Sequence, residues 1–250
     1  MTAGELEGSV AIVTGAAGGV GRATVALLAD RGARVVAEDI DPTVRELESD
    51  LVAVVEGDVA DVDTARRAIA LAHERFGALH ALVNNAARFL MKSVADTSDD
   101  EWDDLFRVNV RGAFIHAREA MPALSEHGDG RIVNVASISG TIGLPAQTAY
   151  CATKGAIVQL TRQLAVENAP RVRVNAVAPG AIDTAFVDRA VGDMPGRDRD
   201  AEMAAIAAMH PLGRMAEPEE IAEVIAFLAS PRSRIITGAI VMADGGFTAQ

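Results

Sequence analysis

Tyr150 and Lys154 are the two residues whose types and spacing point most clearly to chemistry. The first is the only tyrosine in the chain and the second is one of only two lysines. Because residues four apart lie on one face of a helix, a helix here would hold the Lys154 ammonium beside the Tyr150 phenol. A neighbouring cation favours the phenolate, so the pKa of Tyr150 is expected to fall from its usual value near ~10. The pair is a candidate proton donor and acceptor, the alternative being an exposed helical pair of no consequence.

A glycine-rich turn, Thr14-Gly15-Ala16-Ala17-Gly18-Gly19-Val20-Gly21, is a second chemical signal. It follows an apolar run and opens a helical pattern, and backbone amides at the start of a helix can bind a pyrophosphate. Glycine permits positive φ and a close approach of the backbone to that anion. The next apolar run ends in Glu38-Asp39, where a carboxylate would bind ribose hydroxyls. This order of strand, turn, helix, strand and acid predicts a dinucleotide site.

Asp39 also indicates which dinucleotide binds. A carboxylate that faces the 2′-phosphate of NADP at contact distance costs roughly 1 to 4 kcal/mol per charge pair. The glycine turn contains no arginine, and Ile40 follows Asp39, so nothing obvious in the sequence offsets this repulsion. We therefore expect NAD to be preferred over NADP.

The composition limits the classes of partner. The chain has 250 residues, of which 50% are hydrophobic, and a formal net charge of -12. This acidity argues against a nucleic-acid partner, and no apolar run has membrane-spanning length. The five histidines lack metal-binding spacings and Cys151 is the only cysteine, so we expect no metal site and no intrachain disulfide. Without a signal-peptide pattern, these features predict a cytoplasmic protein that acts on small molecules.

Short β-branched runs alternate with helical periods, which is typical of a parallel sheet with crossover helices. The expected strands span residues 10–13, 34–37, 51–55, 79–83, 131–135, 172–177 and 239–242. Helical stripes at 20–28 and 221–228 would cover the sheet, and Ser98 with Glu101 forms a capping box that opens a long helix. The predicted fold is α/β: a single Rossmann domain over residues 1–250, with a doubly wound parallel sheet of about seven strands flanked by helices on both faces.

Residues 185–211 form the least regular stretch, and we predict that they are a lid over the substrate. Their apolar side chains would suit an adaptable pocket, with ordinary packing as the alternative: Phe186, Val187, Met194, Met203 and Met209. Other candidates for the same pocket are Arg88, Leu90, Ile138, Leu144 and Pro145.

Further motifs extend from one end of the chain to the other. Besides the glycine turn they are Asp58-Val59, Asn84-Asn85-Ala86, Asn109, Ser137, Tyr150, Lys154, Asn175, Pro179-Gly180, Ile182-x-Thr184, Pro211-Leu212-Gly213-Arg214, Thr237-Gly238 and Asp244-Gly245-Gly246. In this order they resemble the short-chain dehydrogenase/reductase family over essentially the whole length. The resemblance implies a catalytic set of Asn109, Ser137, Tyr150 and Lys154. It implies a cofactor site of Gly15, Gly19, Val20, Gly21, Asp39, Asp58, Val59, Asn85, Ala86, Tyr150, Lys154, Pro179, Gly180, Ile182 and Thr184.

The family pattern also implies roles for these residues. Tyr150 would exchange the proton of an alcohol hydroxyl, and Lys154 would lower the pKa of that phenol and hold the nicotinamide ribose. Ser137, favoured over Ser139 by its spacing to Tyr150, would bond the substrate oxygen. Asn109 would anchor a water. Relatives are commonly homotetramers, assembled through helices that correspond to residues 101–124 and 148–168.

The sequence thus predicts an NAD-dependent oxidoreductase that transfers hydride between the cofactor and a secondary alcohol or ketone. Departures from the family pattern, such as Ala87 in place of a glycine and Ile235 in place of a common aromatic residue, leave the catalytic set intact. A sugar or polyol substrate stays open. A 3-oxoacyl-carrier-protein reductase is an alternative that Asp39 disfavours, because that group usually uses NADPH. A catalytically silent NAD(H)-binding sensor or scaffold is the alternative from another class.

Overall fold

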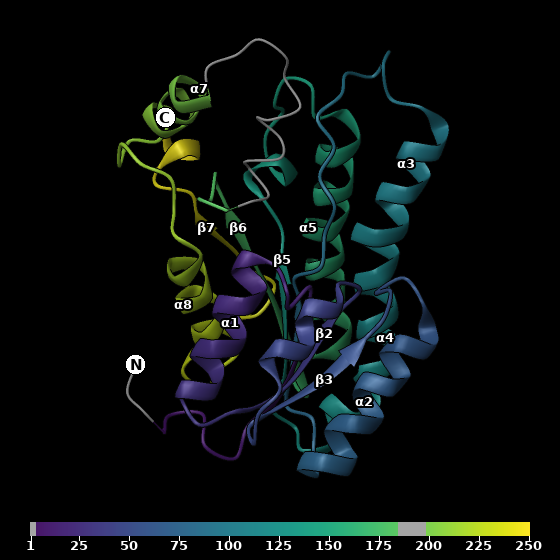
Figure 1. Ribbon diagram of the computed structural model, residues 1–250. Coiled ribbons are helices and arrows are strands. Elements are labelled where there is room, and N and C mark those ends of the chain that lie inside the picture. Colours follow the sequence, from purple (N-terminus) through teal and green to yellow (C-terminus); the bar gives the residue numbers. More distant parts are fainter. Residues whose placement is uncertain (1–3, 185–198) are drawn as a thin grey trace.

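A seven-stranded parallel sheet forms the centre of the protein in a computed structural model that describes residues 4–184 and 199–250. Its strand order is β3-β2-β1-β4-β5-β6-β7 (Figure 1). The strands are β1 (Val10–Thr14), β2 (Arg34–Asp39), β3 (Val52–Glu56), β4 (Ala81–Asn84), β5 (Gly130–Val135), β6 (Val172–Pro179) and β7 (Ile240–Ala243). Every predicted strand is confirmed, with ends that differ by one or two residues.

Helices cover both faces of the sheet, because its strands are apolar on both sides. Helices α1 (Gly19–Asp30) and α8 (Pro218–Leu228) lie on one face, and α2 (Val62–Phe76), α4 (Gly112–Glu126) and α5 (Thr148–Asn168) lie on the other (Figure 1). Neighbouring residues of β1 serve the two layers: Val13 packs in the core under α1 and α8, and Ile12 in the core under α2 and α4. Each of these fully buried side chains contributes about 1.5–3 kcal/mol.

The strand order changes direction at β1. Strands β2 and β3 lie on one side of β1, whereas β4 pairs with its other side and β5 to β7 follow outward. Open parallel sheets bind ligands outside the carboxyl ends of their strands at such a switch point. The segments that follow β1, β4 and β5 therefore meet at one end of the sheet, and these segments carry most of the predicted site.

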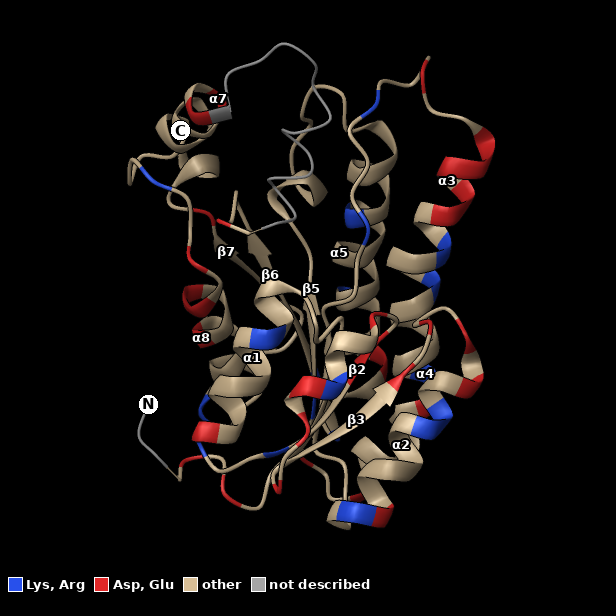
Figure 2. Ribbon diagram, in the orientation of Figure 1, with Lys and Arg blue, Asp and Glu red and all other residues tan. Residues whose placement is uncertain are grey.

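One helical run joins α3 (Asp99–Phe106), a π turn (Arg107–Arg111) and α4. The capping box opens it as predicted: Ser98 Oγ accepts a hydrogen bond from the Glu101 N–H at 3.3 Å, and Glu101 Oε2 accepts one from the Ser98 N–H at 3.0 Å. The acidic residues of α3, red in Figure 2, crowd its amino-terminal turns, where the helix dipole favours negative charge. These acidic side chains therefore stabilise the start of the helix.

Of the predicted lid, residues 185–198 lie outside the described residues, and with them Phe186, Val187 and Met194. The remainder forms α7 (Arg199–Ala208) and the turn that follows it, at the same end of the molecule as the C-terminus (Figure 1). Short 3-10 turns span Pro42–Leu47, Ile138–Gly140, Pro231–Ser233 and Phe247–Ala249.

Within residues 4–184 and 199–250, no helix combines the length and the apolar character that a membrane span requires. In the same part of the chain, no group of three or more His, Cys, Asp or Glu side chains is arranged to hold a metal ion.

Candidate active site

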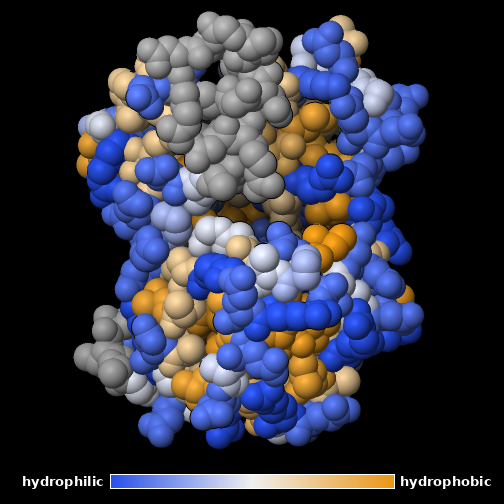
Figure 3. All heavy atoms as spheres, in the orientation of Figure 1, coloured by the Kyte–Doolittle hydropathy of each residue, from blue (hydrophilic) through white to orange (hydrophobic). Residues whose placement is uncertain are grey.

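A cavity of about 970 Å³ opens at the carboxyl ends of the strands. Every residue predicted to bind the cofactor lines it, from Gly15 to Thr184, and so does Ser137. Asn109 is the exception among the predicted site residues, because it lies behind the wall. Figure 3 shows hydrophobic surface exposed at the middle of the face that is turned toward the reader. The structure therefore brings together groups that are spread over most of the chain.

The glycine turn forms a cradle that side chains would fill. Gly15 has a φ of 67°, and a Cβ on Gly21 would lie 2.0 Å from the Gly15 carbonyl oxygen. Asn85 fixes this geometry, because its Nδ2 donates to the carbonyl oxygens of Thr14 and Gly15, each at 2.9 Å. A tight turn at the start of α1, with its backbone exposed to the cavity, fits a nicotinamide dinucleotide, whose pyrophosphate binds backbone N–H groups.

The Asp39 carboxylate lies directly against this turn. Its Oδ2 accepts a hydrogen bond from the Ala17 N–H at 2.9 Å, and its Oδ1 accepts one from the Asp41 N–H at 2.9 Å. Arg22, which directly follows the glycine turn, pairs with Glu46 at 3.3 Å instead. The negative charge of Asp39 therefore faces the cavity without a basic partner among its hydrogen bonds.

Glu38, the neighbour of Asp39, points to the opposite face of β2 because side chains alternate along a strand. Its Oε2 lies 2.8 Å from His116 Nε2, and both side chains are 1% exposed. His116 Nδ1 lies 3.0 Å from the Gly112 carbonyl oxygen, which can only accept, so Nδ1 carries a proton. Burial lowers the pKa of His116, but the hydrogen bond and charge of Glu38 outweigh it and raise that pKa overall. The pair is buried and hydrogen-bonded, and it lies at the cavity, whose lining includes Glu38.

Asp58 and Val59 form another part of that wall. Asp58 Oδ1 accepts from the Ala60 N–H at 2.8 Å, and its Oδ2 binds Arg107 Nη1 at 2.6 Å. Burial opposes ionisation of Asp58, but these hydrogen bonds and the charge of Arg107 lower its pKa. Arg107 also forms an ion pair with Asp104, and Asp104 forms another with Arg88. A chain of ion pairs thus joins the two ends of the cavity.

Helix α5 holds Tyr150 and Lys154 side by side, as the spacing predicted. The Lys154 Nζ donates to the Val135 carbonyl oxygen at 2.8 Å and lies 5.6 Å from the centre of the Tyr150 ring. Phe89 packs edge-on against the same ring, with 4.8 Å between ring centres. Tyr150 is 7% exposed and Lys154 is 3% exposed, so the exposed helical pair is excluded.

Burial changes the electrostatics of this pair. It raises the pKa of Tyr150 far above its usual value, and a hydrogen bond with Ser137 offsets only part of that rise. It lowers the pKa of Lys154 to about 8. The expected depression of the Tyr150 pKa is therefore not present in the protein without ligands, because desolvation of the phenolate outweighs its neighbours. A phenolate needs further positive charge in the cavity.

A hydroxyl relay extends from Ser137 along the cavity wall. Ser137 Oγ donates to Ser139 Oγ at 3.2 Å, and Ser139 Oγ donates to Gln147 Oε1 at 2.8 Å. All three side chains line the cavity. Ala146, which precedes Gln147, has a φ of 55°, a strained value for a residue with a side chain. The sequence favoured Ser137 over Ser139; in the structure both serines line the cavity and are hydrogen-bonded to each other, and Gln147 lies beside them.

Asn109 acts on the backbone of the loop that follows β4. Its Oδ1 accepts from the Arg88 N–H at 2.7 Å, and its Nδ2 donates to the Arg88 carbonyl oxygen at 2.9 Å. Its Nδ2 also donates to Thr153 Oγ1 at 3.1 Å, which joins the loop to α5. The π turn supplies the position from which one amide reaches both segments.

The end of the cavity that was predicted to hold the substrate has mainly apolar walls. Of the predicted pocket residues, the wall contains Arg88, Ile138, Leu144, Pro145 and Met209. Leu90 instead packs with Leu105, Ala149 and Tyr150 beneath the wall, and Met203 does not line it. The wall also contains Glu202, Ile206 and His210, which lie within the predicted lid 185–211. The sequence analysis did not single out Phe89, Met91, Gln147 and Phe247, whose proximity to recognised motifs was their only sequence signal.

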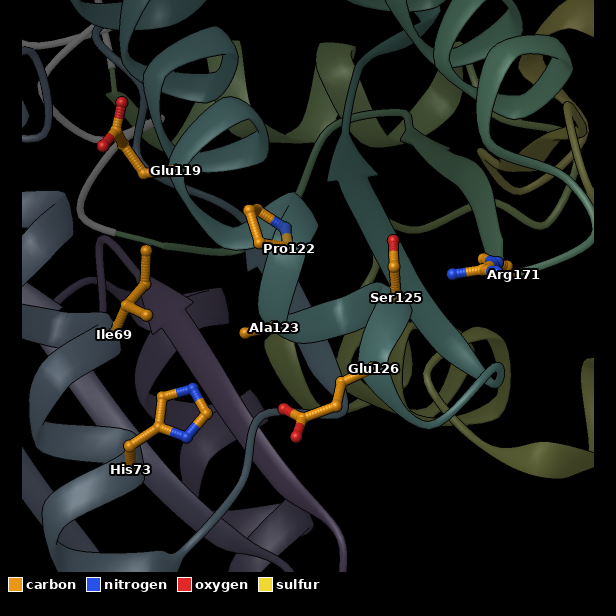
Figure 4. A pocket seen from close by; sticks show the side chains of 8 residues that line it. All are labelled: Ile69, His73, Glu119, Pro122, Ala123, Ser125, Glu126 and Arg171. Carbon is orange, nitrogen blue, oxygen red and sulfur yellow. The ribbon is translucent and has the colours of Figure 1, made fainter.

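A second hollow lies between α2 and α4 and has a volume of about 480 Å³. Figure 4 shows His73 of α2 and Glu126 of α4 pointing toward one another across it. It contains none of the predicted site residues, so the chemistry belongs to the larger cavity.

Known proteins resemble this chain over nearly its whole length. The sequence model of a family described as enoyl-(acyl carrier protein) reductase matches residues 15–248. A 3-oxoacyl-acyl-carrier-protein reductase from Thermotoga maritima is 37% identical, with 96% of this chain and 98% of the relative covered. A cis-4-hydroxycyclohexanecarboxylate dehydrogenase from Sinomonas cyclohexanicum is 40% identical, with 96% of each covered.

A solved structure agrees with these relatives. The ligand-free aldohexose dehydrogenase of Thermoplasma acidophilum superposes with a TM-score of 0.92 at 31% identity, and the match covers 100% of this chain and 97% of that one. Likeness of this extent in both sequence and fold shows that the chain belongs to the short-chain dehydrogenase/reductase family, whose nicotinamide-dependent oxidoreductases act on CH–OH groups.

Proposed function

We propose that the protein transfers hydride between NAD(H) and a secondary alcohol or ketone, with Tyr150 as the general acid and base. One observation carries this proposal: Ser137, Tyr150 and Lys154 line the same cavity as the glycine turn and Asp39. The cavity therefore offers a proton-transfer group at one end and a dinucleotide cradle at the other. The bound nicotinamide would accept or donate the hydride.

The side chains of the cavity manage the proton. In oxidation, Tyr150 takes the proton of the substrate hydroxyl, and in reduction it returns that proton to the carbonyl oxygen. The Ser137 hydroxyl bonds the same substrate oxygen and holds it beside the phenol. Lys154, which is charged below its pKa of about 8, stabilises the phenolate and would bind the nicotinamide ribose.

Asp39 supports NAD in preference to NADP. Its carboxylate lies against the glycine turn through the Ala17 N–H, where the adenosine ribose would bind, and Arg22 is held by Glu46. A 2′-phosphate at this position would face the Asp39 carboxylate, and Arg22 is already paired with Glu46. The expected cost is about 1–4 kcal/mol, depending on the local dielectric constant.

The walls favour a compact apolar substrate with a second polar group. Phe89, Met91 and Leu144 offer apolar surface. Gln147 offers its carboxamide NH₂ as a donor, because its carboxamide oxygen already accepts a hydrogen bond from Ser139. A hydroxylated ring matches this mixture, and the printed name of the Sinomonas relative describes such a substrate. We infer that a cyclic secondary alcohol with a further oxygen substituent is the best first substrate class.

A 3-oxoacyl-carrier-protein reductase is the second candidate, because the Thermotoga relative has that name. The position of Asp39 disfavours it if that activity depends on NADPH. A catalytically silent sensor is disfavoured by the complete Ser137, Tyr150 and Lys154 set. The Tyr150→Phe variant distinguishes an enzyme from a sensor. An enzyme would lose its turnover, whereas a sensor has no turnover to lose.

The test follows NADH formation from NAD over a panel of cyclic diols, hydroxycyclohexane carboxylates, steroids and sugars, with NADPH-dependent reduction of a 3-oxoacyl thioester in parallel. NAD-dependent turnover that disappears in Tyr150→Phe would support the proposal. Faster NADPH-dependent reduction of the thioester would favour the second candidate. NADH binding without turnover across the panel would favour the sensor.

We also propose a homotetramer in the cytoplasm. Apolar side chains are exposed on helices that relatives use for assembly: Phe114 of α4 is 45% exposed and Val166 of α5 is 80% exposed. Ile235 is 91% exposed beside β7. The single cysteine suits a reducing compartment. A monomer mass in gel filtration with light scattering would contradict the tetramer.

A further inference from the structure

His210 follows α7 and is only 4% exposed, yet it lines the cavity. Its Nδ1 lies 2.9 Å from the Ile206 carbonyl oxygen, and the Ala181 N–H donates to its Nε2 at 3.2 Å. A carbonyl can only accept and an N–H can only donate, so the partners assign the proton to Nδ1. Both nitrogens of a neutral ring are thus used, one by α7 and one by the segment after β6.

The segment after β6 is built around this ring. A Cβ on Gly180 would lie 2.7 Å from His210 Nε2, so the imidazole occupies the space that a side chain would need. Phe247 packs on the other side of the ring, with 5.2 Å between ring centres. Ala181 also accepts a hydrogen bond from the Ala216 N–H at 3.0 Å. The Ala181 N–H, however, bonds to the imidazole.

We propose that His210 is a positioning residue that couples α7 to the cofactor segment Pro179–Thr184. The inference rests on the proposed function, in which this segment contacts the nicotinamide half of NAD. Ile206 and Met209 line the substrate end of the cavity, and Gly180 and Ala181 line it beside them. A nicotinamide that orders the segment therefore also orders α7 through the imidazole, which positions the substrate wall.

Two substitutions separate the two bonds of the ring. His210→Asn offers an amide N–H near the position of Nδ1 but no acceptor near Ala181, whereas His210→Gln offers a longer side chain whose Oε1 can reach the Ala181 N–H. His210→Phe keeps the ring shape and removes both bonds. His73→Phe, which makes the same change in the hollow between α2 and α4, is the matched control.

The measurement is amide hydrogen exchange by mass spectrometry on the full-length protein, free, with NAD, and with ADP-ribose, which lacks the nicotinamide. We expect NAD to slow exchange in α7, at residues 201–208, by roughly tenfold, the effect of one hydrogen bond of about 1.4 kcal/mol. ADP-ribose should protect residues 57–60 at the adenosine end but leave α7 unchanged. The coupling should persist in His210→Gln and His73→Phe and be lost in His210→Asn and His210→Phe.

Three results would overturn the proposal. In the first, NAD protects residues 57–60 of the native protein without protecting α7. In the second, α7 protection by NAD survives in both His210→Asn and His210→Phe. Protection at no peptide with NAD would remove the proposed cofactor and this inference together, a pattern that differs from the first two. If His210→Phe does not fold, His210→Asn alone decides between coupling and its absence.

Discussion

The ionisation of Tyr150 offers the sharpest test of the proposed chemistry, because this residue is the only tyrosine in the chain. Burial raises its pKa in the free protein, so we expect little tyrosinate up to and beyond the usual midpoint near ~10. Binding of NAD would bring the positive charge of the nicotinamide ring close to the phenol and lower that pKa. The midpoint should therefore fall when NAD is added.

The contribution of Lys154 follows from its position. The Lys154 Nζ lies 5.6 Å from the centre of the Tyr150 ring, and at an effective dielectric constant of about 20 two unit charges at that separation attract by about 3 kcal/mol, which would lower the Tyr150 pKa by about 2 while Lys154 is protonated. Lys154→Met removes that attraction, so the Tyr150 midpoint in the NAD complex should rise, by up to about 2 where the native midpoint lies below the Lys154 pKa of about 8. Lys92→Met is the matched control, because the only other lysine pairs with Glu101 at 2.5 Å and does not line the cavity.

The assay is near-ultraviolet absorbance of tyrosinate after a pH jump, read before alkaline unfolding, at saturating NAD. Trp102 does not ionise in this range, so the absorbance change reports Tyr150 alone. Equal midpoints for the native protein and Lys154→Met would refute the role of the ammonium. A native midpoint that NAD does not lower would refute the phenolate mechanism itself.

Three further predictions concern the walls of the cavity. Asp39→Ser should raise the affinity for NADP relative to NAD by about tenfold or more, measured by fluorescence titration of the reduced cofactors, and an unchanged ratio would contradict the charge argument. Gly21→Ala should abolish NADH binding, because its Cβ would lie 2.0 Å from a carbonyl oxygen of the turn, whereas Gly143→Ala meets nothing within 4 Å and should bind normally. Glu38→Leu should destabilise the fold by about 3–5 kcal/mol in urea unfolding, and adding His116→Leu should restore part of that loss. Because the pKa of His116 is raised in the folded protein, the Glu38–His116 pair should contribute its full stabilisation below pH ~6.5. That contribution should be lost as the pH rises through the pKa of His116 in the folded protein. If the stability of Glu38→Leu had the same pH dependence as that of the native protein, this prediction would be wrong.

The sequence predicted the strands and the cofactor cradle because local patterns encode both. Apolar runs such as 10–13 must be buried on both faces. The glycines of the turn are required by the backbone geometry of the turn itself. The positions of Tyr150 and Lys154 on one helix face follow from a spacing of four. These features depend on neighbours in the chain, so pattern and structure agree.

Other features depend on contacts between distant segments and were beyond the sequence. The rise in the Tyr150 pKa comes from burial of the ring, against which Phe89 packs, and a spacing rule contains no information on desolvation. The relay to Gln147 and the two bonds of His210 join residues whose side chains meet only after folding. Leu90 shows the converse: it follows a recognised motif, yet it turns to the core instead of the cavity.

The hydrogen bonds between the Asn109 side chain and the Arg88 backbone affect which substitutions this loop can accept. The amide holds the loop by the N–H and the carbonyl of one residue and makes no use of the Arg88 side chain. Since every amino acid except proline supplies the same two backbone groups, the loop can keep its course while its side chains change. Under the proposed function, residues 87–91 are thus a place where substitution can change substrate preference while the bonds of Asn109 to this loop and to Thr153 of α5 are kept.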